Sequence, residues 1–368
     1  MHAIYLDHAA TTPPAPQVIE AVAQCMRECT ANPSAAYSAA GEARKVLRQT
    51  REVLASAIGC DRNELTFTSG GTEANNWVFA GMEGKHVVIS AIEHASVLEA
   101  AGAHKCHITL VEPDANGVIL PEAVEKAITP DTALISVQYV NNETGLIHPV
   151  EEIGRLARSR RILFHCDAVQ AFGHIPVAAK QIQADFLCAS AHKLYGPRGV
   201  GFLYIRTGIG HTALIHGGGQ ENGRRSGTEN VPAIAGFKVA AELAMIDLQQ
   251  RALREQALVR SLIQELHTAI PGCRMLGADA NRVPGVCAVL LPGLPSEYAI
   301  AKLDLAGIQL SGGAACAARL AQPSHVYRAM GLSEKDAACV LRFSPGRATT
   351  ESDIKTTVQT LTALYGSL

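Results

Sequence analysis

Two patterns of apolar residues alternate along the first two thirds of the chain. One has the spacing of amphipathic helices and predicts them over residues 14–29, 39–58, 72–80, 95–101 and 151–160. The other is a short run of consecutive apolar residues, which is typical of a strand buried on both faces. Such runs predict strands at residues 65–68, 86–90, 107–111, 133–140, 162–166, 185–189 and 200–205. This alternation indicates an α/β fold with a mostly parallel sheet that helices cover on both faces.

The pattern changes after Gly227. Residues 233–270 are rich in Ala, Leu, Gln and Glu and predict one nearly continuous helix, which Pro271 and Gly272 end. Two strands and two helices are predicted beyond it, at residues 286–290, 339–343, 296–306 and 351–365. We therefore expect a smaller α+β domain that a long helix joins to the large one, with the boundary near residue 248.

Composition narrows the class of protein. The 368 residues include 32 basic and 34 acidic ones, and this balance gives no electrostatic footprint for direct nucleic-acid binding. No apolar run is long enough to span a membrane, and residues 1–10 lack the pattern of a signal peptide. The ten cysteines are too few for a disulfide scaffold and none forms a C-x-x-C pair, so a cytoplasmic location is expected.

Polar residues suited to chemistry follow five of the predicted strands. Ligands of open parallel sheets bind beyond the carboxyl ends of the strands, so we expect these residues to meet in one site. They are Ser69-Gly70-Gly71-Thr72, Glu93-His94, Asn141-Asn142-Glu143, Asp167 with Gln170, and Ser190-Ala191-His192-Lys193.

Part of this set matches what pyridoxal 5'-phosphate (PLP) requires. A lysine binds that cofactor covalently, an aspartate holds the proton of its ring nitrogen, and a helix start binds its phosphate. Lys193, Asp167 and the turn before Thr72 supply these groups, and His94 offers an aromatic face for the ring. Taken singly, they also fit a solvated lysine, an ordinary capped turn and a loop histidine bonded to a carbonyl. The turn lacks the lysine of a P-loop and the G-x-G-x-x-G of a dinucleotide fold, so ATP and NAD are not expected.

Two more candidates lie in the C-terminal part. Cys316 stands among small residues with Arg319 nearby, which is typical of an exposed, easily ionised thiol, although most single cysteines are inert small hydrophobes. Arg342, near the end of a predicted strand, suits the α-carboxylate of an amino acid; a surface ion pair is the alternative. Cys and His residues lack the paired spacing of metal ligands, so no metal is expected.

Six motifs in order, together with the segment Tyr5-Leu6-Asp7-His8 near the start of the chain, give a resemblance that covers nearly the whole sequence. The motifs are Thr68-Ser69-Gly70-Gly71-Thr72-Glu73, Val140-Asn141-Asn142-Glu143-Thr144-Gly145, Asp167-Ala168-Val169-Gln170, Ser190-Ala191-His192-Lys193, His216-Gly217-Gly218-Gly219-Gln220-Glu221 and Arg225-Ser226-Gly227-Thr228. With them the chain resembles a cysteine desulfurase of the NifS/IscS type, among the class V PLP enzymes. These are PLP-dependent transferases with the aspartate aminotransferase fold (fold type I) and a sheet of the seven-stranded type.

The resemblance implies a role for each candidate around the ring of the cofactor. Lys193 holds PLP covalently, His94 stacks on its ring, and Asp167 pairs with the ring nitrogen. Gln170 and Asn142 lie near the phenolate oxygen and the substrate.

The same resemblance implies the phosphate site and the nucleophile. Thr72, Ser190 and His192 are expected to bind the phosphate, joined by Thr228 from the partner subunit of a homodimer with shared active sites. Gly71 is expected to be a further cofactor-binding residue. Arg342 takes the substrate carboxylate, and Cys316 is the nucleophile. The large PLP-binding domain is expected to comprise residues 13–248, and the small domain residues 1–12 and 249–368.

The implied reaction takes sulfur from L-cysteine, leaves a persulfide on Cys316 and releases L-alanine. The sulfur is expected to pass to an acceptor protein, for iron–sulfur cluster assembly or for tRNA or DNA thiolation. Relatives that serve iron–sulfur scaffolds carry a longer C-terminal tail than one ending at Leu368, so the resemblance favours that role less. Ala315, Ala317, Ala318 and Tyr37 depart from residues common in the family, which bears on loop affinity and on the choice of acceptor.

Two alternatives stand beside this hypothesis. Another class V enzyme, such as a selenocysteine lyase or a small-amino-acid aminotransferase, would share Lys193 and Asp167 but would not depend on Cys316. A non-enzymatic metal or sulfur carrier would explain the Cys and His residues without a cofactor, and it predicts a colourless protein.

Overall fold

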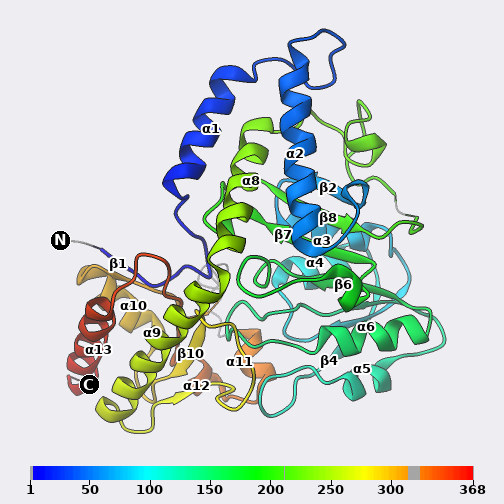
Figure 1. Cartoon of the computed structure of the whole chain (residues 1–368). Helices are drawn as coiled ribbons and strands as arrows, with labels where there is room; N and C mark the ends of the chain where they lie inside the picture. Colours follow the sequence, from blue (N-terminus) through cyan, green and yellow to red (C-terminus); the bar gives the residue numbers. More distant parts are fainter. Residues whose placement is uncertain (1–2, 211, 314–323, 368) are drawn as a thin grey trace.

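A seven-stranded sheet forms the centre of the computed structural model, which describes residues 3–210, 212–313 and 324–367 (Figure 1). Its strands are β2 (Leu65–Thr68), β3 (His86–Ser90), β4 (His107–Val111), β5 (Thr132–Ser136), β6 (Leu163–Asp167), β7 (Phe186–Ser190) and β8 (Gly201–Ile205). They lie in the order β2-β8-β7-β6-β5-β3-β4, and all neighbours are parallel except β8, which is antiparallel to β2 and β7. The predicted α/β fold with a mostly parallel sheet is confirmed.

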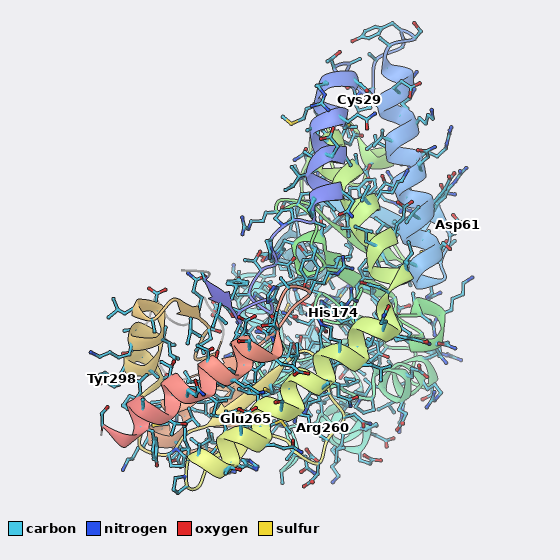
Figure 2. The ribbon with its side chains drawn as sticks, turned by 60° about the vertical axis from the view of Figure 1, so that its left-hand side comes forward. Cys29, Asp61, His174, Arg260, Glu265 and Tyr298 are labelled. Atoms are coloured by element: carbon cyan, nitrogen blue, oxygen red, sulfur yellow. The ribbon has the colours of Figure 1, made fainter. Side chains whose placement is uncertain are left out.

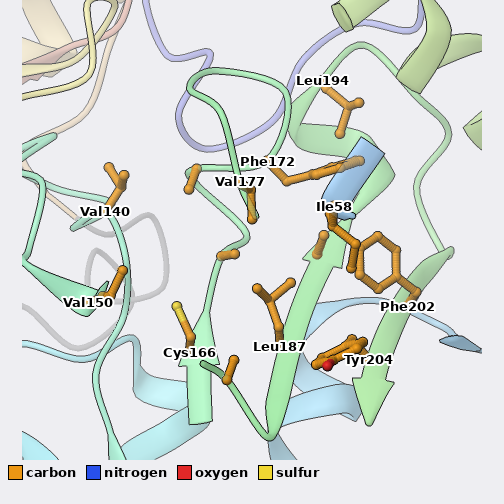
Figure 3. Packing of buried hydrophobic residues seen from close by; sticks show 14 of the residues in the cluster. Ile58, Val140, Val150, Cys166, Phe172, Val177, Leu187, Leu194, Phe202 and Tyr204 are labelled. Atoms are coloured by element: carbon orange, nitrogen blue, oxygen red, sulfur yellow. The ribbon is translucent and has the colours of Figure 1, made fainter. Parts of the chain in front are cut away.

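Alternate residues of each strand pack on opposite faces of the sheet, because successive side chains of a strand point to opposite sides. On β8, Phe202 and Tyr204 belong to one cluster of buried residues, part of which Figure 3 shows, and Leu203 and Ile205 belong to another. The first cluster includes side chains of three long helices, α1 (Pro16–Glu28), α2 (Ala40–Ile58) and α8 (Val231–Ile246). The second includes side chains of α3 (Gly71–Ala80) and α4 (Ala95–Ala103).

Three shorter helices complete the large part: α5 (Pro121–Ala127), α6 (Val150–Ser159) and α7 (Ala179–Ile182). The strand expected at 133–140 is too long, since β5 ends at Ser136. Beyond this point the backbone N–H of Gln138 donates to Glu93 Oε1 at 2.6 Å, and its side-chain amide donates to the carbonyl of Ile92. These contacts turn the chain out of the strand and toward α4.

The helix expected over residues 233–270 is confirmed except at one point, because α8 ends at Ile246 and α9 (Leu248–Ala269) begins after a break at Asp247. Oδ1 of Asp247 accepts from Arg251 Nη1 at 3.2 Å and from Arg347 Nη2 at 3.1 Å. Arg347 comes from the C-terminal part, so a tertiary ion pair outweighs the helix propensity of one residue. The break falls close to the predicted domain boundary, and the domain limits themselves stay a prediction.

A third hydrophobic cluster lies in the smaller part, between α9, α13 (Glu351–Gly366) and a sheet of three antiparallel strands. The sheet has the order β12-β10-β9, with β9 (Arg274–Met275), β10 (Cys287–Leu290) and β12 (Val340–Phe343). The short elements of this part are α10 (Ser296–Leu305), α11 (His325–Ala329) and α12 (Glu334–Ala337). Figure 2 shows α9 and α13 side by side, with Arg260 and Glu265 on α9.

The N-terminal strand β1 (Ile4–Tyr5) pairs in parallel with β11 (Ile308–Gln309), so the start of the chain lies against the smaller part. The segment after β1 then crosses to the large sheet, where the backbone N–H of Thr12 donates to the carbonyl of His192 at 2.9 Å. Among the described residues, the helices are all too short or too polar to cross a membrane.

Candidate active site

The candidate residues at the strand ends line one cavity of about 250 Å³. It lies beyond the carboxyl ends of β6 and β7 and beside the first turns of α3 and α4, and Ala9 and Ala10 of the N-terminal segment form part of its wall. Ten of the predicted site residues line it: Gly71, Thr72, His94, Asn142, Asp167, Gln170, Ser190, His192, Lys193 and Arg342. Strand order thus brings together residues that lie far apart in the sequence.

Asp167 is the last residue of β6 and is buried. Its Oδ1 accepts a hydrogen bond from the backbone N–H of Val169 at 2.9 Å, and its Oδ2 accepts one from Asn75 Nδ2 at 2.8 Å. These two donors hold the orientation of the carboxyl group, and Asp167 lines the cavity. A carboxylate placed in this way suits the protonated nitrogen of a pyridine ring.

Lys193 ends the short helix η2 (Ala191–Lys193), which follows β7 directly. Its Nζ donates to the backbone carbonyls of Ala9 at 2.6 Å and Ala10 at 2.9 Å. The carbonyl of Lys193 is itself bonded to His174 Nε2 at 3.0 Å. Burial lowers the pKa of His174 to about 4, so the neutral ring donates this hydrogen bond. The amine is therefore held at the cavity wall by its own side-chain contacts and by a fixed backbone.

His94 is the residue before the first turn of α4 and accepts there at Nδ1 from the backbone N–H of Ser96 at 3.1 Å. Nδ1 also lies 2.7 Å from Ser96 Oγ. Burial lowers the pKa of His94, and the electrostatic effects of Lys193 and His325 add to this, whereas Asp167 opposes it. The ring is therefore neutral at neutral pH, which suits an aromatic face that stacks on a cofactor ring.

The start of α3 is open to an anion. Gly70 precedes the helix at φ 152° and no side chain caps the first backbone N–H groups. A Cβ on Gly71 would lie 2.7 Å from Val169 Cγ2, so only glycine leaves this turn and its neighbour undisturbed. Thr72 and Ser190, which both carry hydroxyl groups, line the same cavity. Uncapped N–H groups at a helix start with hydroxyls beside them are a general phosphate site.

His192 and Gln170 connect the cavity to the N-terminal segment. His192 Nδ1 lies 3.1 Å from Thr11 Oγ1, and Gln170 Nε2 donates to the carbonyl of Ala9 at 2.8 Å. Burial, helped by the charge of Lys193, lowers the pKa of His192 to about 4. His192 therefore lines the cavity as a neutral hydrogen-bonding group.

Arg342 reaches the cavity from β12 and is almost completely buried. Its Nη1 donates to the backbone carbonyl of Asn142 at 2.8 Å, and its Nη2 pairs with Asp7 Oδ1 at 2.6 Å. Nε of Arg342 and Oδ1 of Asn142 are buried without a hydrogen-bond partner among the described residues. A buried guanidinium with an unused donor is suited to an incoming carboxylate.

Two predicted site residues are not placed in this cavity. Cys316 lies outside the described residues. Thr228 lines a separate hollow of about 220 Å³ together with Ser69 and Arg225, and Arg225 forms a two-pronged ion pair with Glu73 at 2.9 and 3.1 Å. The expected role of Thr228, as a phosphate contact for the partner subunit, stays a prediction.

Sequence reasoning missed four residues of the site. Asn75 and Ser96 line the cavity, Gln138 binds Glu93, and Asp7 pairs with Arg342. Asp7 lies in the segment Tyr5-Leu6-Asp7-His8 that carries part of the resemblance, and Asn75 lies one helical turn after Gly71. The positions of these two residues could therefore have indicated that they belong to the site. Nothing in the local pattern distinguishes Ser96 from an ordinary helix residue.

The residues present fit PLP. The uncapped start of α3 can take its phosphate, Asp167 its ring nitrogen, and Lys193 its aldehyde carbon, all around one cavity. Within the described residues, no group of three or more His, Cys, Asp or Glu side chains could hold a metal ion.

Comparison with known proteins agrees with this geometry. The aminotransferase class-V family matches residues 4–356. The cysteine desulfurase IscS of Dictyoglomus turgidum is 39% identical over 379 residues, which cover 99% of this chain and 95% of that protein. The structure of a NifS-like protein from Rickettsia africae superposes with a TM-score of 0.92 at 31% identity, over 99% of this chain and 100% of that one.

A third relative was solved with a small molecule bound. The structure of SspA in complex with cysteine has a TM-score of 0.83 at 33% identity, and covers 94% of this chain and 100% of that one. The family match spans nearly the whole chain, and the cavity has the groups that the cofactor of this family needs. The chain therefore belongs to the class-V aminotransferases, a PLP-dependent family, and within it to the cysteine desulfurases of the IscS and NifS-like type.

Proposed function

We propose that this protein is a cysteine desulfurase, which removes sulfur from L-cysteine, releases L-alanine and leaves a persulfide on Cys316. The observation that carries the proposal is the single cavity in which Asp167, His94, Lys193 and Arg342 meet. Relatives named cysteine desulfurase and a related structure that contains cysteine support the choice of substrate.

Each residue has a task in this reaction. When bound, PLP withdraws electrons from the substrate Cα, which makes the Cα proton acidic. Asp167 keeps the ring nitrogen protonated, and Arg342 binds the substrate carboxylate and so fixes which bond faces Lys193. Lys193 Nζ then takes the proton from Cα and later returns one. The neutral His94 covers the ring and excludes water from that face.

The sulfur step belongs to Cys316. Its thiolate attacks the substrate sulfur, a new S–S bond forms, and the carbon–sulfur bond breaks. The electron pair of the broken bond stays with the carbon, which takes up a proton and leaves as the methyl group of alanine. The sulfur remains on Cys316 as a persulfide, ready for a second thiolate.

We propose further that the enzyme is a homodimer in which Thr228 of one subunit completes the phosphate site of the other. A protein thiol is the proposed sulfur acceptor, in iron–sulfur cluster assembly or in the thiolation of tRNA or DNA. The nine cysteines of the described residues are all free, which supports a reducing, cytoplasmic setting for the formation and transfer of a persulfide.

The test is to mix the purified, PLP-loaded protein with L-cysteine in the absence of reductant and to weigh the peptide that contains Cys316. A gain of one sulfur atom together with released alanine supports the proposal. An unmodified Cys316 in a yellow protein that turns over another amino acid would replace it with a different class V reaction, such as selenocysteine lysis or transamination.

A further inference from the structure

A chain of hydrogen bonds behind the cavity links Asp167 to His94. Asn75 is 1% exposed, and its Nδ2 donates both to Asp167 Oδ2 at 2.8 Å and to Ser96 Oγ at 2.9 Å. The other end of this amide is fixed too, because Cys188 Sγ donates to Asn75 Oδ1 at 3.1 Å. Burial raises the pKa of the Cys188 thiol well above its ordinary value, so the thiol keeps the proton that it donates. The orientation of the Asn75 amide is therefore settled by its partners.

The same reasoning places the protons of His94. Ser96 Oγ accepts from Asn75, so its own proton is free to point at His94 Nδ1, 2.7 Å away. The backbone N–H of Ser96 donates to that nitrogen as well, at 3.1 Å. With two donors aimed at it, Nδ1 carries no proton, and the ring proton of neutral His94 lies on Nε2.

We propose that Ser96 and Asn75 are positioning residues, which hold His94 in the tautomer with its proton on Nε2 and tie it to the carboxylate of Asp167. This inference deepens the proposed function, on which it rests for its meaning in catalysis. It predicts that His94 meets the cofactor and the substrate as a hydrogen-bond donor at Nε2 and not as a base at that atom.

We call the hydrogen bonds that run from Asp167 through Asn75 and Ser96 to His94 the Asn75–Ser96 bridge. Ionisable groups around His94 act on its pKa in addition to this bridge. Asp167 on β6, Lys193 on η2 and His325 on α11 face the ring, and the first favours a positive charge on it while the other two oppose one. Protonation of His94 at Nδ1 would place a proton against the N–H of Ser96. The hydrogen bonds from Ser96 to Nδ1 therefore oppose the charged form of His94, in addition to the effect of Lys193 and His325.

The experiment measures tautomers directly in the full-length protein labelled with ¹⁵N-histidine, first without PLP and then with it. Two-bond correlations between ring carbon-bound protons and nitrogens identify the tautomer, and the signal missing in His94→Gln assigns His94. We expect a bare Nδ1 and a protonated Nε2. In Ser96→Ala the pKa of His94 should rise by about half a unit to one unit, the equivalent of one hydrogen bond. Ser96→Thr, which keeps the hydroxyl, should restore the wild-type titration.

Two asparagine variants separate the bridge from general loosening of the fold. Asn75→Ala should raise the pKa of His94 as Ser96→Ala does, whereas Asn76→Ala should leave it unchanged. Asn76 is the partly exposed neighbour, and its Nδ2 donates only to the carbonyl of Thr72 in the described structure, at 2.9 Å. In the loaded enzyme, the pH profile of kcat/KM should shift with Ser96→Ala in the same direction.

Either of two results overturns the inference: a proton on Nδ1 of His94 in the wild type, or an unchanged titration in Ser96→Ala. Both are read from the resting protein without turnover. A protein that shows the expected tautomer but forms no persulfide would thus refute the proposed function and leave the bridge standing.

Discussion

Replacing Arg342 with lysine separates a contact to substrate from a contact within the fold. The guanidinium is almost completely buried and spans the carbonyl of Asn142 and the carboxylate of Asp7. Its Nε has no hydrogen-bond partner among the residues that the structure describes. A lysine keeps the positive charge but has one compact donor group in place of a fork. It can hold Asp7 or the substrate carboxylate, and not both with the same geometry.

The size of the effect follows from the contact that is lost. A hydrogen bond to a charged group contributes about 1.5–3 kcal/mol, and each tenfold in Kd corresponds to about 1.4 kcal/mol. Arg342→Lys should therefore weaken the binding of L-cysteine roughly ten- to a hundredfold. Cysteamine has the same amine and thiol without the carboxylate, so its affinity should change little.

The assay compares these two ligands by the absorbance change of the PLP-loaded protein, in a Cys316→Ser background that prevents turnover. The preference for L-cysteine over cysteamine should fall roughly ten- to a hundredfold in Arg342→Lys. Asp7→Asn is the matched control, because it removes the charge that faces Arg342 and leaves the guanidinium in place. The carboxylate assignment is refuted if the preference survives in Arg342→Lys, or if Asp7→Asn reduces it by as much.

Three further outcomes are expected. Lys193→Ala should release no alanine from L-cysteine while its circular dichroism matches the wild type; measurable alanine release would show that another base takes the Cα proton. Cys316→Ser should still bind L-cysteine but should gain no sulfur by mass spectrometry, and a persulfide elsewhere on the chain would contradict the assignment of the nucleophile. Burial raises the pKa of Glu255 from 4.5 to about 7, although the charge of Arg251, 3.9 Å away, opposes this shift. The folded state therefore holds a proton there that the unfolded state releases, and its stability falls as the pH rises between these values. In urea denaturation, the loss of unfolding free energy across this pH range should be smaller in Glu255→Gln than in the wild type, by up to about 3 kcal/mol. If the two proteins show the same dependence of stability on pH, the raised pKa of Glu255 is refuted.

The pattern of the sequence was sufficient for the main architecture and for much of the site. Apolar runs predicted the seven strands of the large sheet, and the polar residues just beyond them included Asp167, Lys193 and His94. Because the carboxyl ends of parallel strands meet at one edge of a sheet, those residues were expected to converge, and they line one cavity. The resemblance to the desulfurases added roles that spacing alone left open.

Tertiary structure decided the contacts that join distant segments. Arg342 and Asp7 are 335 positions apart and pair where the N-terminal segment packs on the smaller part, and Asn75 meets Asp167 over 92 positions. The break at Asp247 coincides with a contact to Arg347, which lies outside the helical pattern of residues 233–270. Periodicity along a chain records which face of an element is buried, but it does not record which distant side chain lies opposite. That partner is determined only when the elements pack, and here it determines the orientation of the residues that would bind substrate and cofactor.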